Sequence, residues 1–295
     1  MTDRGATSFP PRAFDPVALV DARRRTSSTI SVCLPARNEG ATVGAQVAII
    51  REALVESVPL VDEIVVVDDH STDDTAAVAA AAGARVVDAS QVLPDHGQGH
   101  GKGEALWKSL HESTGDLVVW VDADIVDFDP GFVVGLLGPL LTDANIDFVK
   151  GHYHRPEADG VGGGRVTELC ARPLLAQFFP DLATIAQPLA GEYAGRRSLL
   201  EHLPFVVGYG VDVALLIDAA AAVGIDHVAQ ADLGTRHHRN RTLAELGPQA
   251  LAVSQTILTR AGVAPPGPAI LRRPGLEPVT LAVHERPPLS SLDRT

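Results

Sequence analysis

The chain has 295 residues, of which 45% are hydrophobic, and its formal net charge is −13. This length allows one large domain or two closely joined lobes with a sizeable core. The acidic balance argues against nucleic acid as a partner, because duplex binding needs a basic face.

Other sequence features indicate where the protein works. The first residues lack the apolar segment of a secretion signal, and the most apolar later stretches are interrupted by aspartates. We therefore expect a cytoplasmic protein that makes no contact with a membrane. Cys33 and Cys170 lie far apart without a partner motif, so we expect two reduced thiols.

Strands and helices alternate in the first half of the sequence. Residues 1–28 contain two adjacent prolines and three consecutive arginines, and we expect an arm or a short docking helix there. Helical segments are predicted at 41–55, 73–82 and 104–112. Strands are predicted at 30–34, 63–68, 84–87, 116–121 and 147–151. This alternation predicts a mostly parallel α/β sheet flanked by helices.

The pattern changes after about residue 155. A glycine-rich loop at 160–164 leads into a predicted helix at 166–179, followed later by a helix at 212–223 and a strand at 227–233. From residue 264 the chain is rich in Pro and Arg, which is typical of a tail. We divide the chain into an arm (1–28), a first half (29–155), a second half (156–262) and a tail (263–295).

Two carboxylates follow the predicted strand at 116–121. This strand is apolar on both faces, as buried strands are, and it ends in Asp122-Ala123-Asp124. Carboxylate oxygens are ligands that a divalent cation such as Mg²⁺ or Mn²⁺ accepts. A polar strand end that caps the next element is the alternative interpretation.

Polar residues also follow the first two strands. Residues 35–39 (Pro-Ala-Arg-Asn-Glu) end the first, and Asp68-Asp69 end the second. The carboxyl edge of an open α/β sheet is where ligands bind, so Asp68 or Asp69 could contact a ribose hydroxyl or a base nitrogen. In the alternative interpretation, Asn38 caps the following helix.

Two further segments suit anions. Residues 97–103 combine four glycines with Lys102, so that backbone N–H groups and one positive charge can approach a phosphate. The segment is not a Walker A motif, because Gly103 follows the lysine. Residues 236–241 (Arg-His-His-Arg-Asn-Arg) join metal-binding imidazoles to arginines that match phosphate geometry. A solvent-exposed loop and a solvated basic patch are the respective alternatives.

Together these motifs resemble the nucleotide-sugar half of a GT-A glycosyltransferase. Over roughly residues 29–262 the sequence resembles the actinobacterial glucosyl-3-phosphoglycerate synthases, whose pattern the mannosyl-3-phosphoglycerate synthases share. The more specific motifs lie at 164–169 (Gly-Arg-Val-Thr-Glu-Leu), 172–175 (Arg-Pro-Leu-Leu), 191–197 (Gly-Glu-Tyr-Ala-Gly-Arg-Arg), 208–212 (Gly-Tyr-Gly-Val-Asp) and 238–241 (His-Arg-Asn-Arg).

The resemblance implies a GT-A fold with a smaller acceptor-binding lobe. It implies a retaining, metal-dependent homodimer that moves glucose from UDP-glucose to the 2-hydroxyl of 3-phosphoglycerate, with Mg²⁺ or Mn²⁺ as cofactor. Residues 29–155 become the nucleotide-sugar-binding half, and residues 156–262 the acceptor-binding and catalytic half. The alternatives are mannosyl transfer from GDP-mannose, a polyprenyl phosphate acceptor, and nucleotide-sugar binding without catalysis.

The resemblance also implies roles for individual residues. Asp124 and His238 would hold the metal, and the catalytic set is Asp124, Arg165, Asp212 and His238. Acceptor contacts would come from Gly164, Arg165, Val166, Thr167 and Asn240. The nucleotide sugar would contact Pro35, Ala36, Arg37, Asn38, Glu39, Asp69, Lys102, Asp122, Ala123, Tyr209, Asp212, Arg236, Arg239 and Arg241. Two positions depart from the family pattern, which usually has Glu at Asp212 and often has Ser at Asp69.

Overall fold

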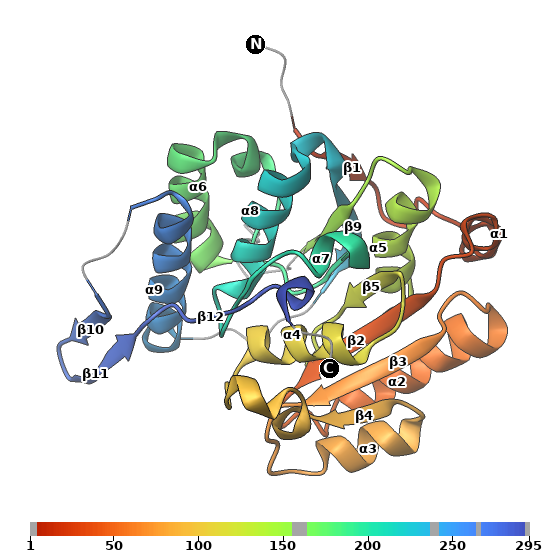
Figure 1. Ribbon diagram of the computed structural model, residues 1–295, viewed down its shortest axis with the longest axis horizontal. Helices are drawn as coiled ribbons and strands as arrows, with labels where there is room; N and C mark the ends of the chain where they lie inside the picture. Colours follow the sequence, from red (N-terminus) through yellow and green to blue (C-terminus); the bar gives the residue numbers. More distant parts are fainter. Residues whose placement is uncertain (1–4, 155–163, 237–241, 264–266, 293–295) are drawn as a thin grey trace.

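The computed structural model describes residues 5–154, 164–236, 242–263 and 267–292. An eight-stranded sheet lies at its centre, in the order β1-β9-β6-β7-β5-β2-β3-β4 (Figure 1). The strands are β1 (Thr7–Phe9), β2 (Ile30–Ala36), β3 (Glu63–Asp68), β4 (Arg85–Asp88), β5 (Leu117–Trp120), β6 (Phe148–His154), β7 (Tyr193–Arg196) and β9 (Val228–Thr235).

Parallel pairing dominates this sheet. Strand β7 is antiparallel to both β5 and β6, and the remaining pairs within the eight strands are parallel. The parallel strands are rich in Val, Ile and Leu and are buried on both faces, as crossover connections require. The predicted α/β class with a mostly parallel sheet is confirmed.

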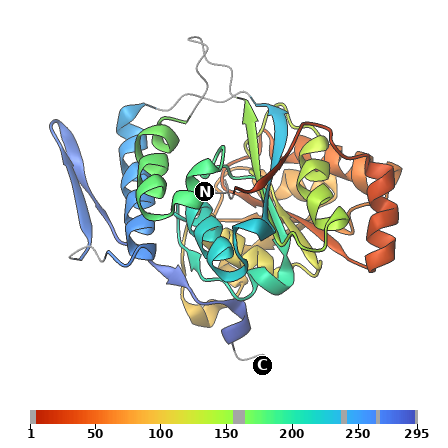
Figure 2. The ribbon, with the colours of Figure 1, turned by 90° about the horizontal axis from the view of Figure 1, so that it is seen from above.

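Two apolar layers cover the sheet, one on each face (Figure 2). In β2, Val32 and Leu34 face the first layer, whereas Cys33 faces the second, because successive side chains alternate. The first layer is built from α1 (Pro16–Thr26), α2 (Val43–Arg51), α3 (Thr75–Ala82) and α5 (Gly131–Thr142). The second contains α4 (Lys102–Glu112), α6 (Arg172–Phe178), α7 (Arg197–Leu200), α8 (Val211–Val223) and α9 (Leu243–Arg260).

Most of the predicted elements are present. The helix expected at 41–55 is α2 continued by a π-helical segment, Glu52–Ser57, and the helix expected at 166–179 is a π-helical segment, Thr167–Ala171, continued by α6. Short 3₁₀ helices form at Ala89–Gln91, Pro94–His96, Pro180–Thr184, Ile225–His227 and Leu289–Ser291. Within the described ranges, no helix combines the length and apolarity needed to cross a bilayer.

The segment beyond residue 266 carries regular structure, although its composition is typical of a tail. Strands β10 (Ala269–Arg273) and β11 (Leu276–Leu281) form an antiparallel hairpin at the side of the molecule, next to α9 (Figure 2). Strand β12 (Glu285–Arg286) then pairs with β8 (Phe205–Val206). The chain end therefore returns to the body of the fold, over α4 (Figure 1).

Candidate active site

The polar residues singled out in the sequence lie where parallel strands end. Pro35 and Ala36 close β2, Asp69 follows β3, and Arg236 follows β9. Asp122, Ala123 and Asp124 come directly after Val121 at the end of β5. Because carboxyl ends of parallel strands meet at one edge, these residues gather along that edge.

Asn38 joins the loops that follow β2 and β3. Its backbone N–H donates to Ser71 Oγ at 2.9 Å, and its Oδ1 accepts from the N–H of Thr72 at 2.8 Å. Its φ of +57° lies in the left-handed region, which asparagine tolerates better than most residues. The residue at the cap of α2 is Thr42, so Asn38 does not have the capping role considered from the sequence. Arg37, which precedes Asn38, is exposed to solvent.

Lys102 links two carboxylates from different elements. As the first residue of α4, it places Nζ 2.7 Å from Asp122 Oδ1 and 3.1 Å from Asp212 Oδ1, in the first turn of α8. Burial alone would lower the Lys102 pKa, but the charges of Asp122 and Asp212 raise it above its usual value. The lysine therefore stays protonated and holds the two carboxylates together.

Arg236 contacts both aspartates of the Asp-x-Asp motif. Its side chain is almost fully buried; it lies 2.7 Å from Asp124 Oδ1 and 3.7 Å from Asp122 Oδ2, and it also pairs with Glu192. The guanidinium donates to the Tyr153 hydroxyl at 3.1 Å. The arginine thus fixes the carboxylates after β5 against the strands beneath them.

A buried polar layer under these residues was not assigned a role from the sequence. Lys150 Nζ donates to the backbone oxygen of Asp212 at 3.0 Å and lies 4.3 Å from the ring centroid of Tyr193. Burial lowers the pKa of Lys150 to about 8. Burial raises the pKa of Glu192 to about 7, although the positive charge of Arg236 acts to lower it. The signal for this layer in the sequence was Lys150, a charged residue in the interior of the strand predicted at 147–151.

Gly191 leaves room for the Lys102–Asp122 pair. A Cβ atom at this position would overlap both Asp122 carboxylate oxygens and Lys102 Nζ. The pair therefore packs directly against the backbone of the glycine that opens the 191–197 motif. This close approach explains why the motif begins with glycine.

In the Asp-x-Asp motif, both Asp122 and Asp124 carry donor atoms that fit a divalent cation. Carboxylate oxygens suit Mg²⁺ and Mn²⁺, and the Asp124 side chain is 48% exposed, so an ion can reach it. The other predicted ligand, His238, lies outside the described residues, as do Arg239, Asn240 and Arg241.

The remaining residues that were predicted to contact a substrate precede α6 and α8 in the chain. Gly164 and Arg165 begin the helical segment, with Arg165 exposed, while Val166 packs against the second core and Thr167 is buried. Tyr209, whose side chain is largely exposed, lies two residues before α8.

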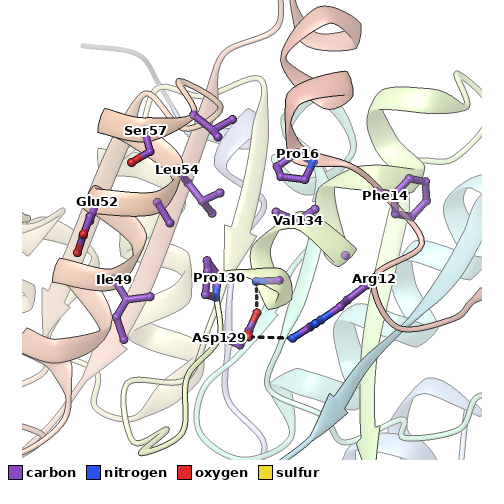
Figure 3. Close-up of a pocket in the computed structure, with 14 residues that line it drawn as sticks. Arg12, Phe14, Pro16, Ile49, Glu52, Leu54, Ser57, Asp129, Pro130 and Val134 are labelled. Carbon is purple, nitrogen blue, oxygen red and sulfur yellow. Dashed lines mark hydrogen bonds and ion pairs between the residues drawn. The ribbon is translucent and has the colours of Figure 1, made fainter.

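A cavity of about 630 Å³ lies elsewhere, between the N-terminal arm, the end of α2 and the start of α5 (Figure 3). Arg12 and Asp129 approach each other to 3.7 Å at its side (Figure 3). Its lining consists of first-layer elements and shares no residue with the Lys102 and Arg236 clusters. We therefore place the candidate active site at the strand edge and not in this cavity.

Comparisons with known proteins identify the family of the chain. Residues 31–204 match the profile of "Glycosyl transferase family 2". The chain is 46% identical over 281 residues to the glucosyl-3-phosphoglycerate synthase of Mycolicibacterium smegmatis, covering 91% of each chain.

Solved structures are similar over nearly the whole chain. The glucosyl-3-phosphoglycerate synthase of Mycobacterium tuberculosis in complex with Mn²⁺, UDP-glucose and phosphoglyceric acid superposes with a TM-score of 0.88, at 44% identity, covering 97% of this chain and 98% of that one. The mannosyl-3-phosphoglycerate synthase of Rubrobacter xylanophilus gives a TM-score of 0.88 at 39% identity, covering 96% of both chains.

Proposed function

Because the chain belongs to glycosyl transferase family 2, in the group of the glucosyl-3-phosphoglycerate synthases, we propose that it transfers glucose from UDP-glucose to 3-phosphoglycerate. The observation that carries this proposal is the near full-length likeness to a synthase whose structure holds Mn²⁺, UDP-glucose and phosphoglyceric acid. The reaction is retaining, and the acceptor atom is the 2-hydroxyl oxygen.

The leaving group of this reaction needs cations at the strand edge. When the glycosidic bond breaks, negative charge grows on a nucleoside diphosphate, and fixed cations stabilise that charge best. Lys102 and Arg236 provide positive charge at the edge, 2.7 Å from Asp122 and Asp124 respectively. Arg239 and Arg241 complete the positively charged set around the diphosphate in our proposal.

A divalent cation, Mg²⁺ or Mn²⁺, would be held by Asp124 and His238, and it supplies Lewis-acid stabilisation of the diphosphate when bound. Asp122 stays paired with Lys102, and Arg236 orients the Asp124 carboxylate toward the site. Residues 35–39, Asp69 and Ala123 form the nucleotide pocket. Tyr209 and Asp212 face the donor sugar.

The acceptor carries a carboxylate and a phosphate, so its site needs cationic and N–H donors. Arg165, Thr167 and Asn240 provide such donors, and the backbone of Gly164 and Val166 lies beside them in the chain. We assign these five residues to the acceptor. Domain roles follow from this assignment: residues 29–155 bind the nucleotide sugar and residues 156–262 bind the acceptor.

The paired state of the nearby carboxylates favours a front-face route. Glu192 is fully buried and pairs with Arg236, while Asp212 pairs with Lys102. A leaving phosphate oxygen would instead accept the proton of the attacking hydroxyl. Mass-spectrometric trapping of a covalent glucosyl-enzyme on Asp212 or Glu192 would overturn this route.

A nucleotide-release assay tests the function. Purified protein with Mn²⁺ and 3-phosphoglycerate is given UDP-glucose, and release of UDP is followed. We expect release that requires both 3-phosphoglycerate and Mn²⁺, and loss of release in Asp124→Ala. Acceptor-independent release, or none, would contradict the proposal.

Mannosyl transfer is the second candidate, because a mannosyl-3-phosphoglycerate synthase is similar over 96% of the chain. The same assay with GDP-mannose and GDP-glucose separates the two candidates. Preference for GDP-mannose would move the protein to the mannosyl branch. Preference for UDP-glucose keeps the first proposal.

We also propose a homodimer that works in the cytoplasm. Exposed apolar side chains on the β10–β11 hairpin, Ile270 and Leu276, support association of two copies there. The free thiols of Cys33 and Cys170 suit a reducing compartment. Light scattering after gel filtration should give twice the chain mass, and a monomer would contradict the dimer.

A further inference from the structure

A second group of possible metal ligands lies beside the glycine-rich loop, apart from Asp124. Asp69 and His70 follow β3, and His100 lies in the segment that precedes α4. The separation of Asp69 Oδ1 from His70 Nδ1 is 2.9 Å, that of the two Nδ1 atoms is 3.3 Å, and that of His100 Nδ1 from Asp69 Oδ1 is 3.8 Å. The three ligand atoms therefore converge on one point.

Hydrogen bonding alone cannot account for both short contacts of His70 Nδ1, to Asp69 and to His100. A neutral imidazole carries at most one proton on Nδ1, and a carboxylate oxygen can only accept. If His70 Nδ1 donates to Asp69, its single proton is not available to be shared well with His100. A cation among the three atoms would instead accept a lone pair from each of them.

The separations have the size that a metal ion requires. A triangle with sides of 2.9, 3.3 and 3.8 Å has a circumscribed circle with a radius of about 2.0 Å. Bonds from Zn²⁺ to imidazole nitrogen and carboxylate oxygen are roughly 2.0–2.2 Å long. An ion close to the plane of the three atoms thus reaches all of them without side-chain movement.

Two features independent of these distances point to the same centre. The Asp69 side chain is only 4% exposed, and a buried carboxylate is costly unless a positive charge compensates it. His70 has a φ of +61°, in the left-handed region that residues other than glycine adopt infrequently and that recurs at ligand-binding positions.

We propose that Asp69, His70 and His100 bind one divalent transition-metal ion such as Zn²⁺, with the fourth coordination position left to a water molecule. Two nitrogens and one oxygen favour Zn²⁺ or Co²⁺ over Mg²⁺, which prefers six oxygens. The site goes beyond the proposed glucosyl transfer and uses different ligands from Asp124, and it shares Asp69 with the proposed nucleotide pocket.

The site is connected to the Lys102 cluster through one peptide. Asp69 Oδ2 accepts the N–H of Gly101 at 2.7 Å, and Gly101 is followed by Lys102, which pairs with Asp122. An ion that fixes Asp69 and His100 therefore holds both sides of the turn that begins α4. A bound ion would thereby fix the position of Lys102.

Titration with Co²⁺ tests the site without any need for catalysis. Chelator-treated Asp124→Asn protein, which lacks a ligand of the catalytic metal, is titrated with CoCl₂ and followed by visible absorption. We expect intense d–d bands, as four-coordinate cobalt gives, that saturate at one equivalent and are abolished by excess Zn²⁺. Protein without such bands would overturn the proposal.

Variants identify the ligands. The His100 side chain is 55% exposed, so His100→Ala in the same background should keep the fold, which circular dichroism checks. We expect at least tenfold weaker Co²⁺ binding in this variant. His111→Ala, an exposed histidine on α4, is the matched control and should bind like its parent. Equal affinity in the His100 and His111 variants would refute the assignment.

Discussion

Single residues at the strand edge are held by alternating charges. Lys102 lies between Asp122 and Asp212, and Arg236 lies between Asp124 and Glu192. Each cation contacts carboxylates from different elements, so the position of any one side chain depends on its neighbours. A substitution here should therefore shift several side chains at once.

Gly191→Ala tests this dependence. The added methyl group would overlap the ends of the Asp122 and Lys102 side chains, which can move aside at low cost to stability. We expect kcat/KM for UDP-glucose to fall by about 100-fold, because a shift of about 1 Å in a positioned group has effects of that size. The free energy of unfolding in urea should change by less than about 1 kcal/mol. A stability loss with normal kcat/KM would contradict this view.

Buried Glu192 and Lys150 predict a stability minimum between pH 7 and 8. The pKa of Glu192 rises from 4.5 to about 7 on folding, so between these values the folded state binds the extra proton and stability falls as pH rises. The pKa of Lys150 falls from 10.5 to about 8, so above pH 8 the unfolded state binds the extra proton and stability rises with pH. Each arm amounts to at most about 3 kcal/mol.

Urea unfolding at pH 5, 7.5 and 9.5 measures both arms. Glu192→Gln should flatten the acid arm alone, and Lys150→Met the alkaline arm alone. A wild-type profile that both substitutions leave unchanged would show that other groups set the pH dependence.

At the scale of elements, the start of α4 is held by close backbone packing. A Cβ on Gly103 would overlap the backbone oxygen of Val206 in β8, so the first turn of α4 lies directly against that strand. Lys102 immediately precedes this contact. The packing of two elements therefore determines where the lysine lies.

Gly103→Ala should consequently destabilise the fold. The methyl group meets rigid backbone, and overpacking of this kind costs typically 1–3 kcal/mol. The free energy of unfolding in urea measures the loss. Gly5→Ala is the control, because its Cβ would lie at an ordinary 3.5 Å from Thr184. Equal stability of both variants would contradict the close packing.

Apolar runs bounded by polar or turn residues predicted elements such as β3 and α8. Helix α5 escaped notice because it is apolar almost throughout and contains Pro139, so it has little helical periodicity. Helix α9 was also missed, and it contains Pro248. The capping box of Thr242 and Glu245 nevertheless marks its start in the sequence. Strand β7 (Tyr-Ala-Gly-Arg) has no run of β-branched residues that would mark it as a strand.

The candidate site could be predicted from the sequence only in part, as was the case for the helices and strands. Strand ends identify Asp122, Asp124 and Asp69, because the carboxyl edge follows from alternating strands and helices. Sequence does not reveal that Arg236 pairs with Glu192, since they lie 44 positions apart and meet only after β6, β7 and β9 assemble. Buried pairs of this kind depend on three-dimensional neighbours.

In the whole molecule, the C-terminal segment contacts and supports the first half of the chain, residues 29–155. Arg286 in β12 pairs with the fully buried Glu104 at 2.6 Å and donates to the backbone oxygen of Gly97 at 3.0 Å. Trp107 Nε1 donates to the oxygen of Pro287 at 2.8 Å. Residues about 180 positions apart thus support the glycine-rich loop and α4 together.

Arg286→Ala should remove the contacts of this residue with Glu104 and Gly97. Glu104 would keep Lys108 as its partner but lose the arginine, and breaking a buried pair costs about 3 kcal/mol. Chemical unfolding measures the cost, and KM for UDP-glucose should rise because the loop at 97–103 loses an anchor. Arg24→Ala, which breaks an exposed pair with Asp21, is the control and should change stability by less than about 1 kcal/mol. If the two variants unfold alike, the segment does not brace the fold.

The pairing of Arg236 with Asp124 also matters at the bench. Since Arg236 already pairs with this carboxylate, we expect the protein to stay folded without an ion there, so that chelators can be used throughout purification. Metal-free stocks can then be stored and reloaded with a chosen cation, so that Mg²⁺, Mn²⁺ and Co²⁺ can be compared on one preparation.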